Sequence, residues 1–254
     1  MNLVLLDSPD TRYLLAGTPS AAHLLRVLKI SVGGSFWCGV KNGLRGLATV
    51  STVSASGDIG FDVVWEKGDL LRLPPVRLLV GLSRPQTMKK IFAVASEIGC
   101  SRIDVFRSEK GDPAYAESSI WKSGDETLFE ILKKSAEQTC VPAIPEFALH
   151  ESLSAFLRQN YNCPGENDTR IALDVYAEKN SFGDLSFPSG NEVLLAIGSE
   201  RGWSGGEREA LRGSGFVFAH LGARVLRVET AVSVALAVAL SKTESWAPHK
   251  VLAV

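Results

Sequence analysis

The period of the hydrophobic positions changes once along the chain, close to Pro74-Pro75. Before this point the short runs 35–40, 44–53 and 59–65 are rich in β-branched and aromatic residues, and turn-forming residues separate them. Short strands at this spacing are typical of a small barrel. We therefore expect residues 1–72 to form an N-terminal β domain.

After the two prolines, apolar strands alternate with amphipathic helices. The run 76–82 is continuously apolar, the segment from Met88 to Ile98 carries apolar residues at helical spacing, and 102–106 is a second strand. This βαβ rhythm predicts an α/β domain over residues 73–254, with a parallel sheet covered by helices. The further predicted elements are helices at about 125–139, 151–159 and 229–242 and extended segments at 143–147, 170–176, 192–198 and 216–222.

Two of the helices carry additional signals. Ser204 and Glu207 stand three residues apart at the start of one helix, which is the spacing of a capping box. The helix 229–242 is apolar on almost its whole surface. Such a helix is expected to be buried on more than one side, which favours a subunit interface.

The composition is that of an ordinary globular protein, with 45% hydrophobic and 22% charged residues. The longest apolar run, 231–240, is too short to cross a bilayer, and Asp7 comes too early for a secretory signal. We expect a cytoplasmic protein with no membrane partner. The cysteines show no CxxC pair and no histidine at ligand spacing, so neither a disulfide framework nor a metal site is predicted; they are Cys38, Cys100, Cys140 and Cys163.

The net charge of −1 argues against a protein that binds nucleic acid over its whole surface. Any RNA binding is therefore expected to be local. Positive charge is concentrated between Arg201 and Arg227, where Arg201, Arg208, Arg212, Arg224 and Arg227 stand against only Glu207 and Glu209.

Glycine-containing turns follow two apolar strands in the last third of the chain, at Gly198–Gly202 and Leu221–Arg224. In a parallel sheet, ligands bind beyond the carboxyl ends of strands, where glycines allow the backbone to approach them. Neither turn fits GxGxxG or GxxxxGK[ST], so nicotinamide and nucleoside-triphosphate binding have no support.

These turns lie within two motifs, AIGSERGWSGGERE and HLGARVLRVETA. Together the motifs resemble the paired signature of the bacterial ribosomal RNA uracil-N3 methyltransferases of the RsmE type, a branch of the SPOUT superfamily. Three upstream segments also resemble that family: His23–Leu28, Met88–Gly99 and Ala136–Gln138. The resemblance covers nearly the whole chain.

The resemblance implies an N-terminal PUA-like β-barrel for RNA (1–72) and a C-terminal SPOUT α/β domain with a deep trefoil knot (73–254). It further implies an S-adenosyl-L-methionine cofactor, a homodimer, and methylation of uracil N3 in small-subunit (16S) ribosomal RNA. Carried over by position, the cofactor-binding residues are Ile197, Gly198, Gly202, Leu221, Gly222, Val225 and Leu226.

Roles in catalysis and RNA binding follow from the same alignment of motifs. Uracil N3 must lose a proton before it attacks, so a cation that stabilises the uracil anion would lower the barrier, and we assign this role to Arg227. Glu200 is the candidate for accepting or relaying the proton. The expected RNA contacts are Arg26, Arg84, Lys89 and Arg224.

Departures from the family pattern leave a second hypothesis open. The family reads G-P-E-G-G where this chain has Gly198–Gly202 with Ser199 and Arg201, and the arginine that usually follows Glu137-Gln138 is missing. A non-catalytic RNA-binding protein with the same fold is the alternative.

Ser204 also fits the chemistry of a serine hydrolase. The run Gly202-Trp-Ser204-Gly-Gly206 matches the GxSxG nucleophile elbow, but only a Glu and His249 could complete the triad. A helix N-cap is the competing role for this serine. Two further residues have competing roles: His220 is a second candidate for the base, and Arg227 could instead form a structural ion pair with Glu229.

Overall fold

A computed structural model describes residues 2–67, 72–122, 126–160, 168–176, 180–187 and 191–243. The chain forms two compact units: Met1–Arg72 with Leu132–Ile144, and Leu73–Ile131 with Pro145–Val254. The helix α4 (Glu126–Thr139) begins in the second unit and ends in the first.

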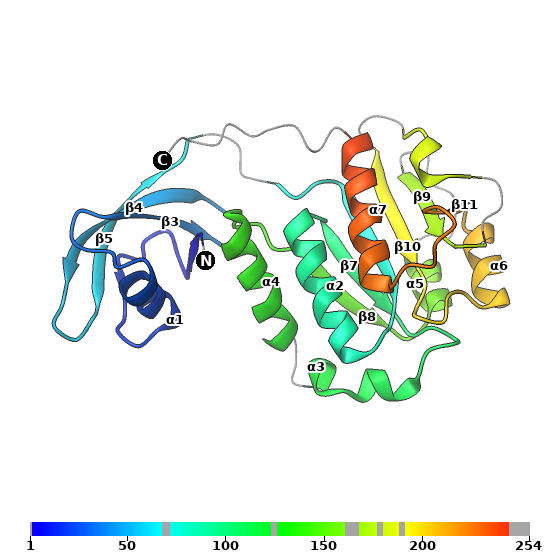
Figure 1. Cartoon of the computed structure of the whole chain (residues 1–254), viewed down its shortest axis with the longest axis horizontal. Coiled ribbons are helices and arrows are strands. Elements are labelled where there is room, and N and C mark those ends of the chain that lie inside the picture. The colour runs from blue at the N-terminus through cyan, green and yellow to red at the C-terminus, as the bar shows by residue number, and fades with distance from the viewer. Residues whose placement is uncertain are drawn as a thin grey trace. The chain divides into compact units, whose positions relative to one another are not determined.

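The first unit is built on a curled five-stranded sheet in the order β1-β3-β4-β5-β2 (Figure 1). The pairs β3/β4, β4/β5 and β2/β5 are antiparallel, whereas β1 pairs with β3 in parallel. Its elements are β1 (Val4–Leu6), β2 (Tyr13–Leu14), α1 (Pro19–Ala22), a π-helical turn (His23–Val27), β3 (Ser35–Val40), β4 (Arg45–Val53) and β5 (Ile59–Trp65). The predicted strands are therefore confirmed.

The core of the first unit lies inside the curl of its sheet. Phe36 and Phe61 pack edge to face with ring centroids 5.3 Å apart, and Leu24 of the π-helical turn is buried in the same cluster. The segment 132–144 is attached to this unit by backbone hydrogen bonds, because the Leu3 amide donates to the Glu137 carbonyl over 2.9 Å.

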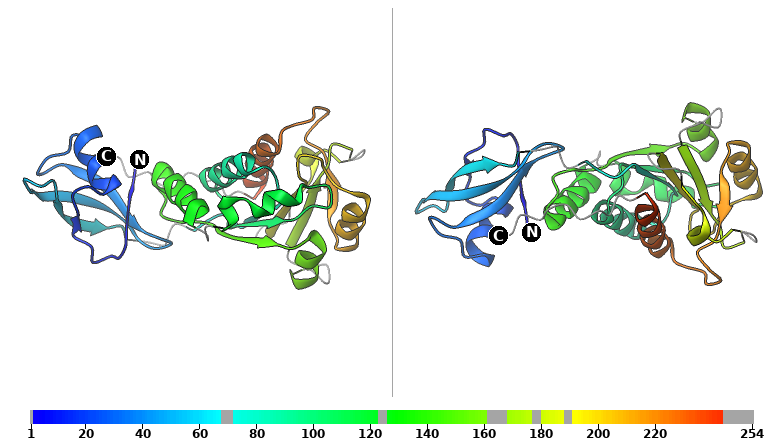
Figure 2. Two further views of the ribbon diagram at one scale, coloured as in Figure 1. Left: turned by 90° about the horizontal axis from the view of Figure 1, so that it is seen from below. Right: turned by 90° about the horizontal axis from the view of Figure 1, so that it is seen from above.

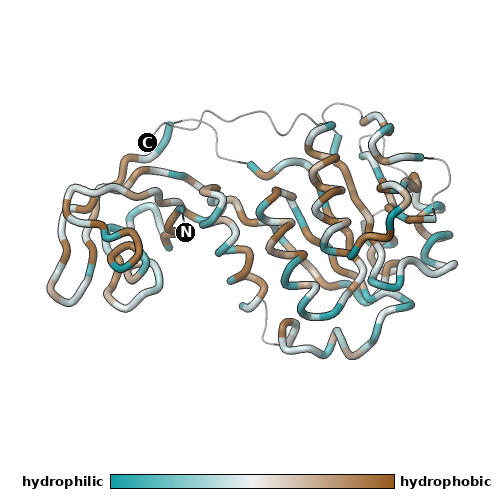
Figure 3. Tube along the Cα trace, in the orientation of Figure 1, coloured by the Kyte–Doolittle hydropathy of each residue, from teal (hydrophilic) through white to brown (hydrophobic). Residues whose placement is uncertain are grey.

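The second unit contains a six-stranded sheet in the order β11-β9-β10-β6-β7-β8, in which every pair is parallel. This confirms the predicted parallel sheet. The central strands are buried on both faces, which explains their continuous apolar runs (Figure 3). The strands are β6 (Val76–Gly81), β7 (Arg102–Phe106), β8 (Glu146–His150), β9 (Asp168–Leu173), β10 (Glu192–Ile197) and β11 (Val217–Ala219).

Helices cover both faces of this sheet (Figure 2). The helices α2 (Pro85–Ile98) and α7 (Val228–Lys242) pack together on one face, and α5 (Leu153–Asn160) and α6 (Gly205–Gly213) pack on the other. Shorter helices are η2 (Pro113–Glu117), α3 (Ser119–Lys122) and η3 (Phe182–Asp184). The predicted helices are confirmed, with ends shifted by up to three residues.

Some predicted strand bounds were wrong. The expected strand at 143–147 runs over Glu146–His150 instead, after Pro142 and Pro145. The strand expected at 170–176 ends at Leu173, because Asp174 turns away and binds Arg208. The segment beyond that turn reaches residues outside the described ranges.

The cysteines behave as buried thiols where they are described. Cys38 and Cys100 are fully buried, and burial raises the pKa of each thiol to about 12. Cys140 is half-buried, and burial also raises its pKa. Cys163 lies outside the described residues.

Candidate functional site

A cleft of about 830 Å³ opens at the carboxyl ends of the parallel strands in the second unit. Segments that follow β6, β7, β9, β10 and β11 all contribute to its wall. The strand order reverses here: the chain runs from β6 outward through β7 and β8, then continues on the opposite side with β9. Such a switch point is where open parallel sheets bind their ligands.

The loop after β10 is folded into a tight turn. The Gly202 amide donates to the Ser199 carbonyl over 2.8 Å, and Gly202 has a φ of +66°, which favours glycine. A Cβ at Gly198 would lie 3.0 Å from the backbone of Gly202. A Cβ at Gly81, the last residue of β6, would clash with the Ser199 amide nitrogen. A side chain at Gly81 would therefore force the two backbone segments apart, and one at Gly198 would displace the Gly202 backbone by a smaller amount.

The segment between β11 and α7 forms the opposite wall. The Gly222 amide donates to Nδ1 of His220 over 3.1 Å, and Gly222 has a φ of +96°. Beyond it Val225 is 82% exposed, and Leu226 and Arg227 lead into α7. Arg227 is the N-cap residue of α7, and its exposed side chain makes no capping hydrogen bond.

The cleft brings together most of the residues that the sequence singled out. All seven predicted cofactor residues line it, namely Ile197, Gly198, Gly202, Leu221, Gly222, Val225 and Leu226. Arg227, Glu200, Arg84 and Arg224 line it as well. Lys89 does not, and its neighbour Lys90 lies there instead. Arg26 belongs to the first unit, in the π-helical turn.

Sequence reasoning missed the wall that β9 contributes. Residues 173–176 line the cleft, and the Trp203 indole, buried against Phe106, donates to the Leu173 carbonyl over 2.9 Å. The Asp174 carboxylate pairs with Arg208 at 2.6 Å. The available signal was an acidic residue at the end of an apolar strand, but the predicted strand extended past it.

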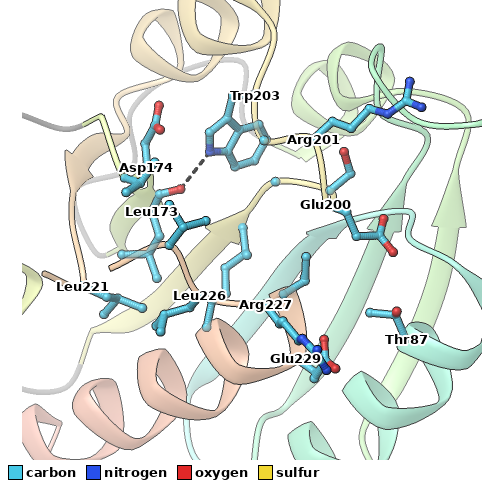
Figure 4. A pocket seen from close by; sticks show the side chains of 18 of the residues that line it. Thr87, Leu173, Asp174, Glu200, Arg201, Trp203, Leu221, Leu226, Arg227 and Glu229 are labelled. Atoms are coloured by element: carbon cyan, nitrogen blue, oxygen red, sulfur yellow. Dashed lines mark hydrogen bonds between the residues drawn. The ribbon is translucent and has the colours of Figure 1, made fainter. Parts of the chain in front are cut away.

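The side chains of the cleft divide into two groups (Figure 4). Leu173, Leu221 and Leu226 gather on one side, near the β9 and β11 ends. Glu200, Thr87, Arg227 and Glu229 lie on the other, between the loop after β10 and the starts of α2 and α7. The cleft therefore has an apolar half and a charged half.

Each acidic side chain of the charged half is bound, one by an ion pair and the other by an amide at a helix start. Glu229 pairs with Lys90 of α2 at 3.3 Å. The pKa of the Glu229 carboxyl is lowered by its own backbone amide at the start of α7 and by Lys90 and Arg227. Oε1 of Glu200 accepts the Arg84 amide over 2.9 Å, at the start of α2.

The hydrolase hypothesis for Ser204 has no support from this geometry. The Ser204 hydroxyl accepts the Glu207 amide over 2.9 Å and donates to Glu109 over 2.5 Å. The Glu207 carboxylate accepts the Ser204 amide in return, which confirms the capping box. His249, the histidine that this hypothesis requires, lies outside the described residues.

Comparison with known proteins gives a consistent result. Residues 71–240 match the family model described as an RNA methyltransferase domain. The chain is 32% identical over 227 residues to ribosomal RNA small subunit methyltransferase E of Treponema pallidum, covering 88% of this chain and 83% of that protein. The chain belongs to the ribosomal RNA small subunit methyltransferase E family.

A more distant member of the methyltransferase E family matches over a similar share of the chain. The Bacillus subtilis protein is 23% identical over 232 residues, which are 87% of each chain. The match therefore includes both units and is not confined to the cleft.

Solved structures share the fold at low sequence identity. The methyltransferase E of Neisseria gonorrhoeae, solved with S-adenosyl methionine, has a TM-score of 0.73 at 21% identity and covers 95% of this chain and 97% of its own. A putative methyltransferase from Legionella pneumophila, solved with the same cofactor, has a TM-score of 0.76 at 21% identity, covering 94% and 97%. The α/β architecture with a curled and a parallel sheet is that of these proteins.

Two absences hold for the part of the chain that the structure describes. None of its helices combines the length and the apolar character that a bilayer crossing requires. No cluster of three or more His, Cys, Asp and Glu side chains there is arranged to hold a metal ion.

Proposed function

We propose that this protein transfers a methyl group from S-adenosyl-L-methionine to N3 of a uracil in small-subunit (16S) ribosomal RNA. The observation that carries the proposal is the divided cleft: backbone turns and apolar side chains form one half, and charged side chains, Arg227 among them, form the other. It lies within the residues that match the RNA methyltransferase domain.

The residues of the apolar half fit the proposed cofactor. The cleft volume of about 830 Å³ is within the range of small-molecule sites. Leu221, Leu226 and Ile197 would pack on the adenosine, and the backbone groups at Gly198 and Gly222 would hydrogen-bond to its polar edges. When bound, the cofactor supplies a methyl group on a positively charged sulfur. Positioning this group in line with the attacking nitrogen supplies much of the rate.

Arg227 is proposed to act on the substrate. Its guanidinium stands at the edge of the cleft, beside Glu229 (Figure 4). Because Glu229 pairs with Lys90, the charge of Arg227 stays available to stabilise a uracil that has lost its N3 proton. The carboxylate of Glu200 lies across the same half of the cleft, and we retain it as the group that accepts or relays the proton.

RNA contacts are proposed at two places. Arg84 and Arg224 line the cleft, so they would bind phosphates next to the target uracil, and Lys89 lies on α2 beside the lining residue Lys90. Arg26 is exposed on the first unit. We assign residues 1–72, with this arginine, to a PUA-like RNA-binding barrel, and residues 73–254 to the catalytic domain.

A deep trefoil knot is proposed for the second unit. Two features support it: β10 is inserted between β9 and β6, and the chain returns from β11 at the edge of the sheet to pack α7 against β6 and β10. A cytoplasmic homodimer is proposed as well. Val234 of the apolar helix α7 is 38% exposed, so this helix has apolar surface to bury against a second subunit.

The deciding experiment is mass-spectrometric nucleoside analysis of ribosomal RNA from cells with and without the gene. Loss of one methyluridine from the small-subunit RNA, restored by the gene in trans, is the expected result. An unchanged methyluridine profile would contradict the substrate assignment.

Calorimetric titration with S-adenosylmethionine separates the catalytic proposal from the non-catalytic alternative. Two departures from the family pattern motivate this alternative: the turn that carries Ser199 and Arg201, and the missing arginine after Glu137-Gln138. Binding of the cofactor is expected, and its absence would favour a protein that only binds RNA.

A further inference from the structure

Two tight turns at the mouth of the cleft have the same design. One turn runs from Ser108 to Gly111 after β7, and the other runs from Ser199 to Gly202 after β10. In each, the amide of the terminal glycine donates to the carbonyl of the initial serine, over 2.9 and 2.8 Å. Each turn therefore presents an acidic residue followed by a basic one at its two central positions: Glu109-Lys110 and Glu200-Arg201.

The acidic residue of each turn is held by a neighbouring helix start. Glu109 accepts the Ser204 hydroxyl at the start of α6, and its own amide donates to Glu207 over 3.0 Å. Glu200 accepts the Arg84 amide at the start of α2. The two turns also meet, because the Ser199 and Ser108 hydroxyls lie 3.4 Å apart. Both acidic side chains thus fix the turns in place.

The basic residues of the turns remain available for a ligand. Lys110 and Arg201 are both exposed and both line the cleft. Within the described residues, no carboxylate lies at ion-pair distance from either one. The side chain of Arg84, at the start of α2, donates through Nε to the Tyr115 hydroxyl over 3.2 Å, which orients a third cation beside them.

We propose that Lys110 and Arg201, with Arg84, form a binding site for the RNA backbone phosphates that flank the target nucleotide. This paired-turn clamp rests on the proposed function, because it assigns the RNA-facing part of the same cleft. Lysine and arginine on rigid turns suit phosphodiesters, since they supply charge at a fixed position without reading the base.

The position of Arg201 favours RNA over the cofactor as its ligand. In Figure 4 its side chain points outward from the loop, away from Leu221 and Leu226 in the apolar half. A cation that served the carboxylate of the cofactor would have to face the cleft interior. Arg201 therefore lies on the outer side of the cleft.

The test measures the salt dependence of RNA binding for Arg201→Gln, Lys110→Gln and the double variant of the full chain. The probe is a fluorescent oligouridylate, followed by anisotropy over a series of KCl concentrations. Each single variant is expected to weaken binding roughly tenfold. Each is also expected to reduce the slope of log K against log [salt] by about 0.7, and the double variant by about twice that.

Controls separate charge from folding and from other surfaces. Arg201→Lys keeps the charge and is expected to keep the slope. Arg158→Gln removes an exposed arginine on α5, away from the cleft, and is expected to change neither slope nor affinity. In methylation assays, the clamp variants should raise KM for RNA with little change in kcat.

Calorimetry with S-adenosylmethionine on the same proteins identifies which proposal fails. Slopes equal to that of Arg158→Gln would overturn the clamp, and so would a loss of cofactor affinity with RNA binding intact. If the unmodified protein binds no cofactor while the variants still lose slope, the clamp stands and the methyltransferase proposal fails.

Discussion

The parallel sheet of the second unit carries two charged regions that differ in how their charges are balanced. Across β6, β7 and β8, the fully buried carboxylate of Asp104 is bound by Arg77 at 2.9 Å, Arg102 at 3.1 Å and His150 at 2.8 Å. Beyond the carboxyl ends, the exposed cations Lys110 and Arg201 line the mouth of the cleft without a carboxylate partner among the described residues.

The charges around Asp104 therefore stabilise the fold, whereas Lys110 and Arg201 are available to bind a ligand. A buried carboxylate is tolerated only when cations and hydrogen bonds surround it, so the Asp104 cluster is complete within the protein. Leaving an exposed cation unpaired costs little free energy, and an anionic ligand can then pair with it. We expect changes in the first region to affect stability and changes in the second to affect activity.

The largest expected effect is on stability. Asp104→Ala leaves Arg77 and Arg102 without their shared partner, and should lower the free energy of unfolding by about 3–5 kcal/mol in urea denaturation. The matched control is Glu146→Gln, which removes the 75% exposed partner of Arg102. It should cost less than about 1 kcal/mol. Equal losses of unfolding free energy in both variants would show that the buried cluster is no more important for stability than the exposed ion pair.

The same carboxylate gives the first region a pH dependence. Burial raises the pKa of Asp104, but hydrogen bonds from Arg77, His150 and Arg102 outweigh it and hold the pKa below 3.8. Its stabilisation is therefore present above about pH 4 and is lost as the pH falls through the lowered pKa. Acid unfolding curves of Asp104→Ala should converge with those of the unmodified protein in this range.

Arg227→Ala should have the largest effect on activity. Removing the cation that stabilises the uracil anion is expected to lower kcat by about 10²–10³-fold. Cofactor affinity and thermal unfolding should remain close to those of Arg158→Ala, because the Arg227 side chain is exposed and makes no capping bond. Equal losses of turnover and cofactor affinity would indicate a binding or structural role instead.

Gly81→Ala tests how the sheet shapes the cleft. The new Cβ would clash with the Ser199 amide, and such overpacking should cost about 1–3 kcal/mol or displace the turn. We expect the affinity for the cofactor, measured by calorimetry, to fall as well. The control is Gly205→Ala, where a Cβ meets nothing within 4 Å. Unchanged affinity in Gly81→Ala would show that the turn does not shape the cofactor site.

The smallest expected effect is that of Ser204→Ala. Loss of the helix cap should lower stability by about 1 kcal/mol, measured by urea denaturation. Because the same hydroxyl holds Glu109, the variant should also weaken RNA binding through the turn of Lys110. A complete loss of turnover would instead indicate a catalytic role for this serine.

The elements of the fold could be predicted from the sequence because their signals are local. The period of apolar residues gave the strands and helices of both units, and the spacing of Ser204 and Glu207 gave the capping box that the structure confirms. The two glycine turns after β10 and β11 were also visible, since turn chemistry depends on neighbouring residues. Both turns follow parallel strands, which made a shared cleft the expected arrangement, although β9 lies between β10 and β11 in the sheet.

Contacts between distant segments were not predictable in this way. Ser199 and Ser108 meet across 91 positions, and Glu200 reaches the Arg84 amide across 116, so no local pattern records either contact. The wall after β9 was missed because its place beside β10 depends on the order of strands in the sheet. Lys89 was chosen over Lys90 because the sequence does not specify which side of α2 faces the cleft.

The sequence by itself determined the strands, helices and caps of this protein and the residue types that its cleft would contain. Only the tertiary structure decided which charges are paired and which face a ligand. The physical reason is range: backbone period and capping act within about four residues, whereas the burial of Asp104 and the exposure of Arg201 depend on which strands and loops the sheet brings together.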